Sequence, residues 1–241
     1  MILISGDVHS QYHVINEQIR HAEKMIDRVL DAVIVLGDFG IYEQPLRQFF
    51  DKEGGDFLRK LYFIDGNHEE FAQFDRLIEK YSHHLNHLAR GKVTQICNGR
   101  FLSLGGARYM DALNSPSGSE IRDCDISHCL AHMADEVDYI LTHDCPAGIG
   151  VPNAPGMEYY GKPGFERGSE LIEHFKPKKW FFAHYHRWFS SKIGESEFFG
   201  LPESWKGFGL LDEKGNYQSV EHVVETREDW LQRFIKKLFS L

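Results

Sequence analysis

Short apolar runs alternate along the chain with segments that have helical periodicity. ILIS at 2–5, AVIVLG at 32–37 and LYFID at 61–65 predict strands buried on both faces. Residues 13–30 lie between the first two runs and predict an amphipathic helix. Its apolar positions are Val14, Ile15, Ile19, Met25, Ile26 and Val29. This β-α-β order is typical of an α/β protein.

The same alternation continues in the second half of the chain. Further strands are predicted at 101–111, 137–144 and 178–186, and further helices at 119–133 and 167–175. A loop rich in Gly and Pro covers 145–164. A hairpin at 210–220 and an amphipathic helix at 226–239, expected to dock on the core, complete the pattern. Because no repeat or linker interrupts it, residues 1–241 are predicted to form a single domain.

Composition narrows the classes of function. The 241 residues, 42% of them apolar, are enough for one substantial core. A net charge of −9 argues against a protein that binds nucleic acid tightly by itself. The four cysteines form no C-x-x-C pair, which argues against a zinc ribbon or a thioredoxin-like site. The sequence shows no signal peptide and no membrane span, so we expect a cytoplasmic protein with free thiols.

Polar residues follow five of the apolar runs at their C-terminal ends. In chain order they are Asp7 and His9, Asp38, Asn67 and His68, His143, and finally His184 and His186. Any one of these groups alone is explained as a turn or a helix cap. Ligands of open α/β sheets bind beyond the carboxyl ends of the strands, so five such groups together predict one shared rim.

This set of side chains suits divalent metal ions. Two carboxylates, one amide oxygen and four imidazoles give mixed oxygen and nitrogen ligation, which fits Mn²⁺, iron or Zn²⁺, with Ni²⁺ and Co²⁺ as further options. Seven ligands are too many for one tetrahedral ion, but they fit two ions if one carboxylate bridges them. Two metals about 3.5–4 Å apart can hold a bridging hydroxide and clamp a phosphate for in-line attack.

The blocks GDVH, GDFG, GNHE, THD and AHYH resemble, in this order, the calcineurin-like metallophosphoesterases. The resemblance implies a four-layer α-β-β-α sandwich of two mixed sheets flanked by helices. It implies that Asp7, His9 and His186 hold one metal and that Asn67, His143 and His184 hold the other, with Asp38 bridging both. If 178–186 were strand throughout, His184 and His186 would share one face. Their assignment to different ions is easier if the strand has already turned into a loop there.

The resemblance also implies roles beyond ligation. His68 would contact the phosphate and protonate the leaving oxygen, with Asp38 as the other catalytic residue and Asn67 also near the substrate. Glu69 would orient either His68 or the loop. The usual Gly before the last H-x-H is Ala183 here, which allows a close backbone approach if its φ is negative.

The sequence narrows the choice of substrate less than it narrows the choice of metal ligands. LTHDCPAGIG, taken with GDFG and WFFAHYHRWF, resembles the RNA lariat debranching branch, whose members cleave 2′,5′-phosphodiesters. That branch commonly has Cys at the position of His9 and longer recognition segments. The resemblance favours a phosphodiester substrate, including nucleotide or RNA-derived ones, and these two departures limit how far it reaches. A protein or small-molecule phosphomonoesterase is the alternative, although Ser10 replaces the Gly of the Ser/Thr phosphatases. A metal-binding scaffold without activity is the third hypothesis.

Several residues outside the motifs are candidates for substrate contacts. Arg187, next to His186, is chosen as a phosphate contact from a set that also includes Arg108, Arg122 and Arg167. Tyr159 and Tyr160 would either stack on a base or pack their loop onto the domain. Cys145 is expected to be a buried, inert thiol. The oligomeric state is left open.

Overall fold

The computed structural model describes residues 1–226, in which two six-stranded sheets lie at the centre. The first sheet has the strand order β12-β11-β1-β2-β3-β4, and the second has the order β5-β6-β7-β8-β10-β9. The first comprises β12 (Tyr217–Glu221), β11 (Gly207–Leu211), β1 (Ile2–Ser5), β2 (Ala32–Leu36), β3 (Leu61–Ile64) and β4 (Asn86–His87). The second comprises β5 (Lys92–Ile96), β6 (Gly99–Leu104), β7 (Tyr139–Thr142), β8 (Lys179–Phe182), β10 (Ser196–Gly200) and β9 (Phe189–Ile193).

Both sheets are mixed. Strands β1 to β4 run parallel, and β11 and β12 continue that sheet antiparallel. Strands β6, β7, β8 and β10 run parallel, and β5 and β9 pair antiparallel at the two edges. The carboxyl ends of β1, β2 and β3 therefore lie at one edge of the first sheet, and those of β7 and β8 lie together in the second.

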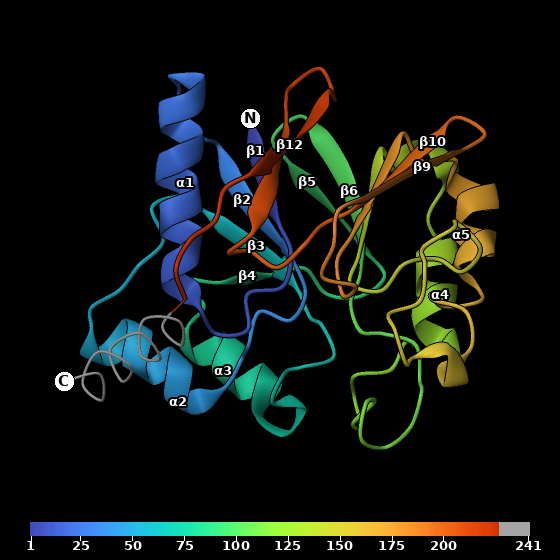
Figure 1. Cartoon of the computed structure of the whole chain (residues 1–241), viewed down its shortest axis with the longest axis horizontal. Helices are drawn as coiled ribbons and strands as arrows, with labels where there is room; N and C mark the ends of the chain where they lie inside the picture. Colours follow the sequence, from blue (N-terminus) through green and yellow to red (C-terminus); the bar gives the residue numbers. More distant parts are fainter. Residues whose placement is uncertain (227–241) are drawn as a thin grey trace.

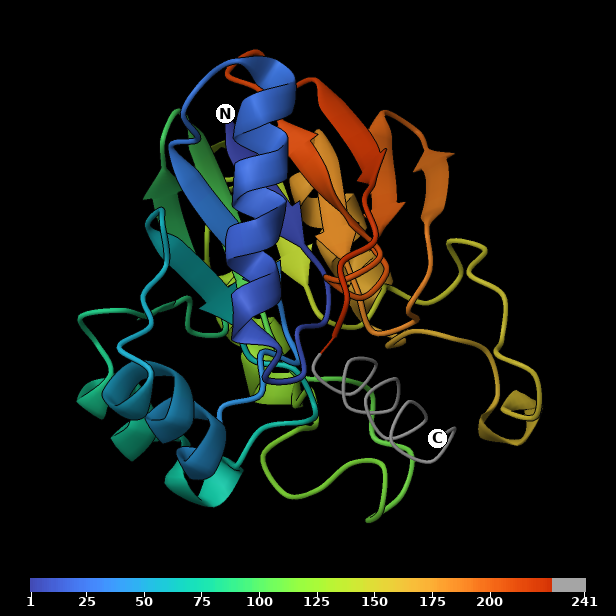
Figure 2. The ribbon, with the colours of Figure 1, turned by 60° about the vertical axis from the view of Figure 1, so that its left-hand side comes forward.

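Helices cover the outer face of each sheet, as Figure 1 shows with α1 at the left and α4 and α5 at the right. The first sheet is covered by α1 (Tyr12–Ile26), α2 (Glu43–Leu46) with a π-helical turn at Arg47–Lys52, and α3 (Phe74–Lys80). The second is covered by α4 (Asp123–Leu130) and α5 (Gly168–Phe175). Figure 2 shows α1 lying along the strands of its sheet.

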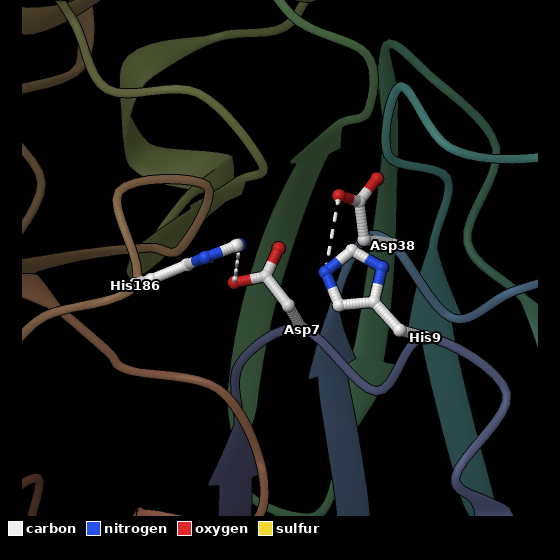
Figure 3. Close-up of side chains that lie close together, drawn as sticks. All are labelled: Asp7, His9, Asp38 and His186. Carbon is white, nitrogen blue, oxygen red and sulfur yellow. Dashed lines mark ion pairs between the residues drawn. The ribbon is translucent and has the colours of Figure 1, made fainter. Parts of the chain in front are cut away.

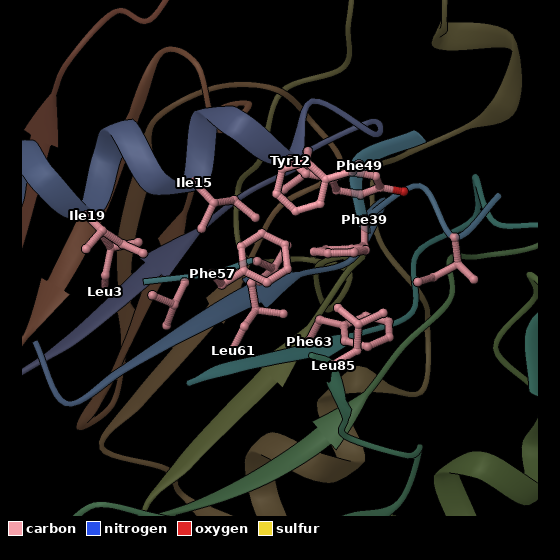
Figure 4. Close-up of a cluster of buried hydrophobic side chains, with 14 of the residues drawn as sticks. Leu3, Tyr12, Ile15, Ile19, Phe39, Phe49, Phe57, Leu61, Phe63 and Leu85 are labelled. Atoms are coloured by element: carbon pink, nitrogen blue, oxygen red, sulfur yellow. The ribbon is translucent and has the colours of Figure 1, made fainter. Parts of the chain in front are cut away.

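Side-chain alternation along the strands places the cores. In β1, Leu3 faces the helical side, where Figure 4 shows it near Ile19, whereas Ile2 and Ile4 belong to the core between the sheets. In β8, Phe181 points to the inter-sheet core, and Trp180 and Phe182 point to α4 and α5. Because the central strands are buried on both faces, their sequences read as continuous apolar runs. The α-β-β-α order of layers that the family resemblance implies is confirmed.

Several predicted elements were too long. The helix predicted at 13–30 ends at Ile26, because Asp27 adopts a left-handed φ of 48°. Met25 and Val29, predicted to belong to its apolar stripe, are 43% and 61% exposed. The strands predicted at 101–111 and 178–186 end at Leu104 and Phe182, and the helix predicted at 119–133 spans Asp123–Leu130. The predicted helix at 226–239 lies, apart from Thr226, outside the described residues.

The C-terminal part of the described chain completes both sheets. Strands β9 and β10 join the second sheet, and the hairpin of β11 and β12, predicted at 210–220, joins the first. This contribution of the C-terminal strands to both sheets agrees with a single domain. That residues 1–241 form one domain stays a prediction. Among residues 1–226, no helix combines the length and apolarity needed to cross a membrane.

Candidate metal centre

The polar residues predicted to share a rim do lie together. Asp7 and His9 follow β1, Asp38 follows β2, and Asn67 and His68 follow β3. His143 follows β7 in the other sheet, and His184 and His186 follow β8. Parallel strands from two sheets thus deliver side chains that are up to 179 residues apart in sequence to one place, because their carboxyl ends meet there.

The backbone in these loops adopts a conformation that residues other than Gly rarely take. His9, Asp38, His184 and His186 have φ values of 46°, 43°, 65° and 54°. Left-handed backbone at non-glycine residues costs free energy and is typical of functional sites. It also shows that His184 and His186 lie in a loop and not on one strand face. Ala183 keeps a negative φ, so the replacement of the usual Gly is accommodated.

Two glycines of the motifs allow the ligands to approach each other. A Cβ on Gly37, where φ is 88°, would lie 2.4 Å from Nδ1 of His143. A Cβ on Gly66 would lie 2.1 Å from Oδ1 of Asp38. Both distances are impossible for real atoms, so these two positions require Gly for a packing reason that the motif alone does not state.

Asp7, His9 and His186 form one group beside Asp38, which we call the open cluster (Figure 3). One ligand atom from each of these four residues lies within 4.8 Å of all the others. Nε2 of His186 lies 3.8 Å from Oδ2 of Asp7, and Nε2 of His9 lies 3.8 Å from Oδ2 of Asp38. The buried Oδ1 of Asp7 has no hydrogen-bond partner among the described residues. A buried carboxylate oxygen without a partner is costly, and a bound cation would satisfy it.

Asn67, His143 and His184 form a second group, which we call the buried cluster. Nδ1 of His143 lies 2.8 Å from the carbonyl oxygen of Leu36 and must donate to it, so Nε2 presents its lone pair. That Nε2 lies 2.9 Å from Oδ1 of Asn67, 3.2 Å from Nδ1 of His184 and 3.4 Å from Oδ1 of Asp38. Ligands about 2.0–2.2 Å from one ion lie roughly 3–3.5 Å from each other, so these residues fit a metal ion.

Asp38 lies between the two clusters. Its Oδ1 accepts the backbone N–H groups of Asn67 and His68, both at 2.8 Å, which fixes the carboxylate. Burial by itself would raise the pKa of Asp38, but the histidines around it, His143 first, outweigh burial and lower it to about 2. Burial, together with the charge of Asp38, raises the pKa of Asp7. Burial lowers the pKa of His143 to about 4, which keeps its ring neutral and able to ligate.

Glu69 orients a loop, one of its two predicted roles. Its Oε1 accepts the N–H of Phe39 at 2.9 Å, and its Oε2 accepts those of Gly40 and Ile41 at 3.0 and 2.5 Å. These contacts hold the residues that follow Asp38. Burial and the nearby charge of Asp38 raise the pKa of Glu69 to about 8, and the N–H bonds from Ile41 and Gly66 oppose that rise.

Residues 201–206 contribute contacts that the sequence did not predict. Nδ1 of His186 lies 3.6 Å from Oε1 of Glu203, and the ring of Trp205 lies 6.1 Å from that of His9, centroid to centroid. The N–H of Ser204 donates to the carbonyl oxygen of Asp7 at 2.8 Å. No motif marks this segment, and the only signal in the sequence is the pair of polar residues Glu203 and Ser204 between apolar neighbours.

A cavity of about 280 Å³ adjoins these side chains. Asn67, His68, His184 and His186 line it together with residues of the 107–118 and 149–165 segments. Of the four candidate arginines, Arg108 and Arg187 line it. Arg122 and Arg167 do not; they pair with Asp125 at 3.0 Å and with Glu170 at 2.7 Å.

The aromatic and cysteine candidates also differ in position. Tyr160 lines the cavity and donates through its hydroxyl to Asp111 at 2.7 Å, whereas Tyr159 is 93% exposed. Cys145 is fully buried, and burial raises the pKa of its thiol, as expected for an inert residue.

The chain belongs to the calcineurin-like phosphoesterases, because the model of that family matches residues 1–188. The family generally uses two divalent metals, in agreement with the cluster of candidate ligands. A search of curated protein sequences finds no match.

Solved structures share the fold at low sequence identity. The protein TT1561 of Thermus thermophilus has a TM-score of 0.63 at 13% identity, covering 91% of this chain and 97% of that one. GAP50, the anchor in the inner membrane complex of Plasmodium, has a TM-score of 0.53 at 8% identity, with 97% and 93% covered. The phosphopantetheinyl hydrolase from Mycobacterium tuberculosis has a TM-score of 0.51 at 12% identity, with 91% and 95% covered. These likenesses establish the fold alone.

Proposed function

We propose that this protein is a two-metal phosphodiesterase, with nucleotide-like diesters as its favoured substrates. The observation that carries the proposal is the position of Asp38 between two clusters of oxygen and nitrogen donors, with Oδ2 facing His9 and Oδ1 facing His143. In the proposed assignment, Asp7, His9 and His186 hold one ion, and Asn67, His143 and His184 hold the other. Asp38 contributes to both. Mn²⁺ and iron are the proposed metals, since the donors mix carboxylate and amide oxygen with imidazole.

The metals and the side chains have separate tasks in this proposal. When bound, the two ions would supply Lewis-acid charge that lowers the pKa of water and neutralises phosphate oxygens. His68 is exposed at the rim, with its ring centroid 5.7 Å from that of His9, and its backbone N–H is held by Asp38. It would carry a proton on its ring and pass it to the leaving oxygen. Asn67 would orient the scissile phosphate, and Arg187 would hold the substrate from the cavity side.

The cavity supports a diester over a monoester. A diester carries a second organic group, and a space of about 280 Å³ beside His68 and His184 offers room for one. The structural likeness to GAP50, which is named an anchor, shows that the fold also occurs in a protein with that description. The full set of candidate metal ligands argues against a scaffold role here. So does the buried Oδ1 of Asp7, which lacks a hydrogen-bond partner in the described chain.

A substrate panel with Mn²⁺ or Fe²⁺ tests the proposal. It compares bis(4-nitrophenyl) phosphate, 4-nitrophenyl phosphate, 2′,3′- and 3′,5′-cyclic nucleotides and a 2′,5′-linked dinucleotide. We expect a higher kcat/KM for diesters than for 4-nitrophenyl phosphate. The reverse order would favour the monoesterase, and no turnover of any ester with metals bound would favour the scaffold.

His68→Ala separates proton transfer from metal binding. We expect kcat to fall about 10²–10⁴-fold with the metal content unchanged, because His68 is not a proposed ligand. His83→Ala, which removes an exposed histidine elsewhere, is the matched control and keeps full activity. Loss of metal from the His68 variant would show that its role is misassigned.

A further inference from the structure

The cavity beside the metal ligands is more basic than the chain as a whole. Arg108, Lys162 and Arg187 line it, whereas Asp144 provides the single carboxylate among its described lining residues. Asp144 is 2% exposed and is occupied as an acceptor by the N–H groups of Arg108 and Cys145 and by the hydroxyl of Tyr185. In a protein of net charge −9, such a concentration of positive charge is a local feature that favours anions.

The cations of this cavity differ from most others in the described chain, because they have no carboxylate partner there. The guanidinium groups of Arg59, Arg90 and Arg100, for example, pair with carboxylates at 2.6 to 2.9 Å. Arg187 instead donates through Nε to the carbonyl oxygen of Tyr185 at 3.1 Å, and no ion pair of its Nη groups exists within residues 1–226. Two Nη groups in a planar fork suit two oxygens of a phosphate.

Arg108 fixes the wall that carries Lys162. Its Nη1 donates to the carbonyl oxygen of Lys162 at 2.8 Å, and its Nη2 donates to that of Tyr160. Tyr160 in turn is held by its hydroxyl bond to Asp111. The 149–165 segment is thereby attached to the 107–118 segment. This holds Lys162, which has no carboxylate partner in the described chain, in the lining of the same cavity as Arg187.

We infer that this cavity is an anion subsite that takes a second phosphate carried by the substrate's organic group, with Arg187 and Lys162 as its recognition residues. The inference rests on the proposed function, since it places the scissile phosphate at the metal ligands and the second phosphate in the cavity. Met110, Met157 and Tyr160 also line the cavity and suit the organic body of such a substrate. The substrate class is therefore a phosphodiester that bears a further phosphate.

Two ligands that differ by one phosphate test the subsite. Isothermal titration calorimetry on the metal-loaded full chain compares thymidine 3′,5′-bisphosphate with thymidine 5′-monophosphate. We expect the bisphosphate to bind about tenfold more tightly, as one charge-assisted hydrogen bond would produce. Lys162→Met and Arg187→Met each reduce this preference severalfold, whereas the matched control Lys192→Met, on edge strand β9, keeps it. Equal binding of the two ligands by the unaltered protein, or an unchanged preference in both variants, would overturn the inference.

A pair of chromogenic diesters separates this failure from failure of the proposed function. Thymidine 3′-phosphate 5′-(4-nitrophenyl phosphate) and thymidine 5′-(4-nitrophenyl phosphate) share the scissile bond and differ only in the 3′-phosphate. We expect kcat/KM to be about tenfold higher for the first ester. If both esters are cleaved at equal rates, the subsite is refuted and the phosphodiesterase stands. If neither is cleaved but the bisphosphate still binds more tightly, the subsite stands and the phosphodiesterase is refuted.

Discussion

The two ligand clusters on either side of Asp38 differ in how they are built. In the buried cluster, the side chain of His143 is fully buried, its ring is fixed by the carbonyl oxygen of Leu36, and its neighbours lie 2.9 to 3.4 Å from Nε2. In the open cluster, the side chains of His9 and His186 are 30% and 43% exposed, and each ring nitrogen lies 3.8 Å from its carboxylate neighbour.

This difference has a physical origin. His143 belongs to a strand end packed between the sheets, where Gly37 leaves only enough room for its ring. His9 and His186 stand on loops at the surface, where their rings are partly exposed to solvent. We therefore infer that the buried cluster is preorganised for its metal and that the open cluster closes around its metal on binding.

The largest expected effect is that of Asp38→Asn, which should impair metal binding by both clusters. Asparagine keeps the shape but loses the charge that faces His9 and His143. We expect activity to fall by about 10³-fold or more, since metal-based charge stabilisation is worth several kcal/mol. Metal analysis after dialysis should show less than two ions per chain. Substantial activity in this variant would contradict the two-metal assignment, and Asp138→Asn at the surface ion pair with Arg100 is the control.

The next effect contrasts His143→Ala with His186→Ala. The first leaves the carbonyl oxygen of Leu36 buried without its partner and opens a cavity, so metal-free protein should lose about 2–4 kcal/mol of unfolding free energy. The second removes a partly exposed ring and should cost less than about 1 kcal/mol. Urea unfolding of both metal-free variants measures the contrast. Equal losses would mean that the two clusters are equally preorganised.

The smallest expected effect is that of Glu203→Gln, which addresses the open cluster alone. Glu203 lies beside Nδ1 of His186, on the other side of the ring from Asp7, where a carboxylate orients a ligating histidine. We expect metal affinity of the open cluster to fall about tenfold, with no change in the buried cluster. Equilibrium dialysis against graded Mn²⁺ resolves the binding of the two ions, with the tighter step expected at the preorganised buried cluster. A loss of affinity confined to that tighter step would contradict the assignment of Glu203 to the open cluster.

The central strands β1, β2, β7 and β8 were predictable because each is buried on both faces and reads as one apolar run. The edge strands β5 and β9 are partly exposed and were not predicted. The end of β8 was less predictable, since Ala183 and Tyr185 continue its apolar pattern after Phe182. The strand predicted at 101–111 instead ran past Gly105 and Gly106, which follow Leu104 and mark the end of β6. The convergence of Asp7, Asp38 and His143 followed from their common position after strands. The spacing of His184 and His186 was ambiguous, because the same two residues share a face on a strand but not in the left-handed loop that they adopt.

The sequence by itself determined the α/β class and the chemical types of the candidate ligands, because apolar periodicity and motif residues are local properties of the chain. The family and its four layers followed from the resemblance that those motifs carry. Only the tertiary structure decided that one ligand cluster beside Asp38 is open and the other buried, that Glu69 holds the loop after Asp38, and that Glu203 reaches His186. It also decided which cations of the described chain lack carboxylate partners beside the site. These features depend on distances between segments far apart in sequence, and packing of the two sheets sets those distances.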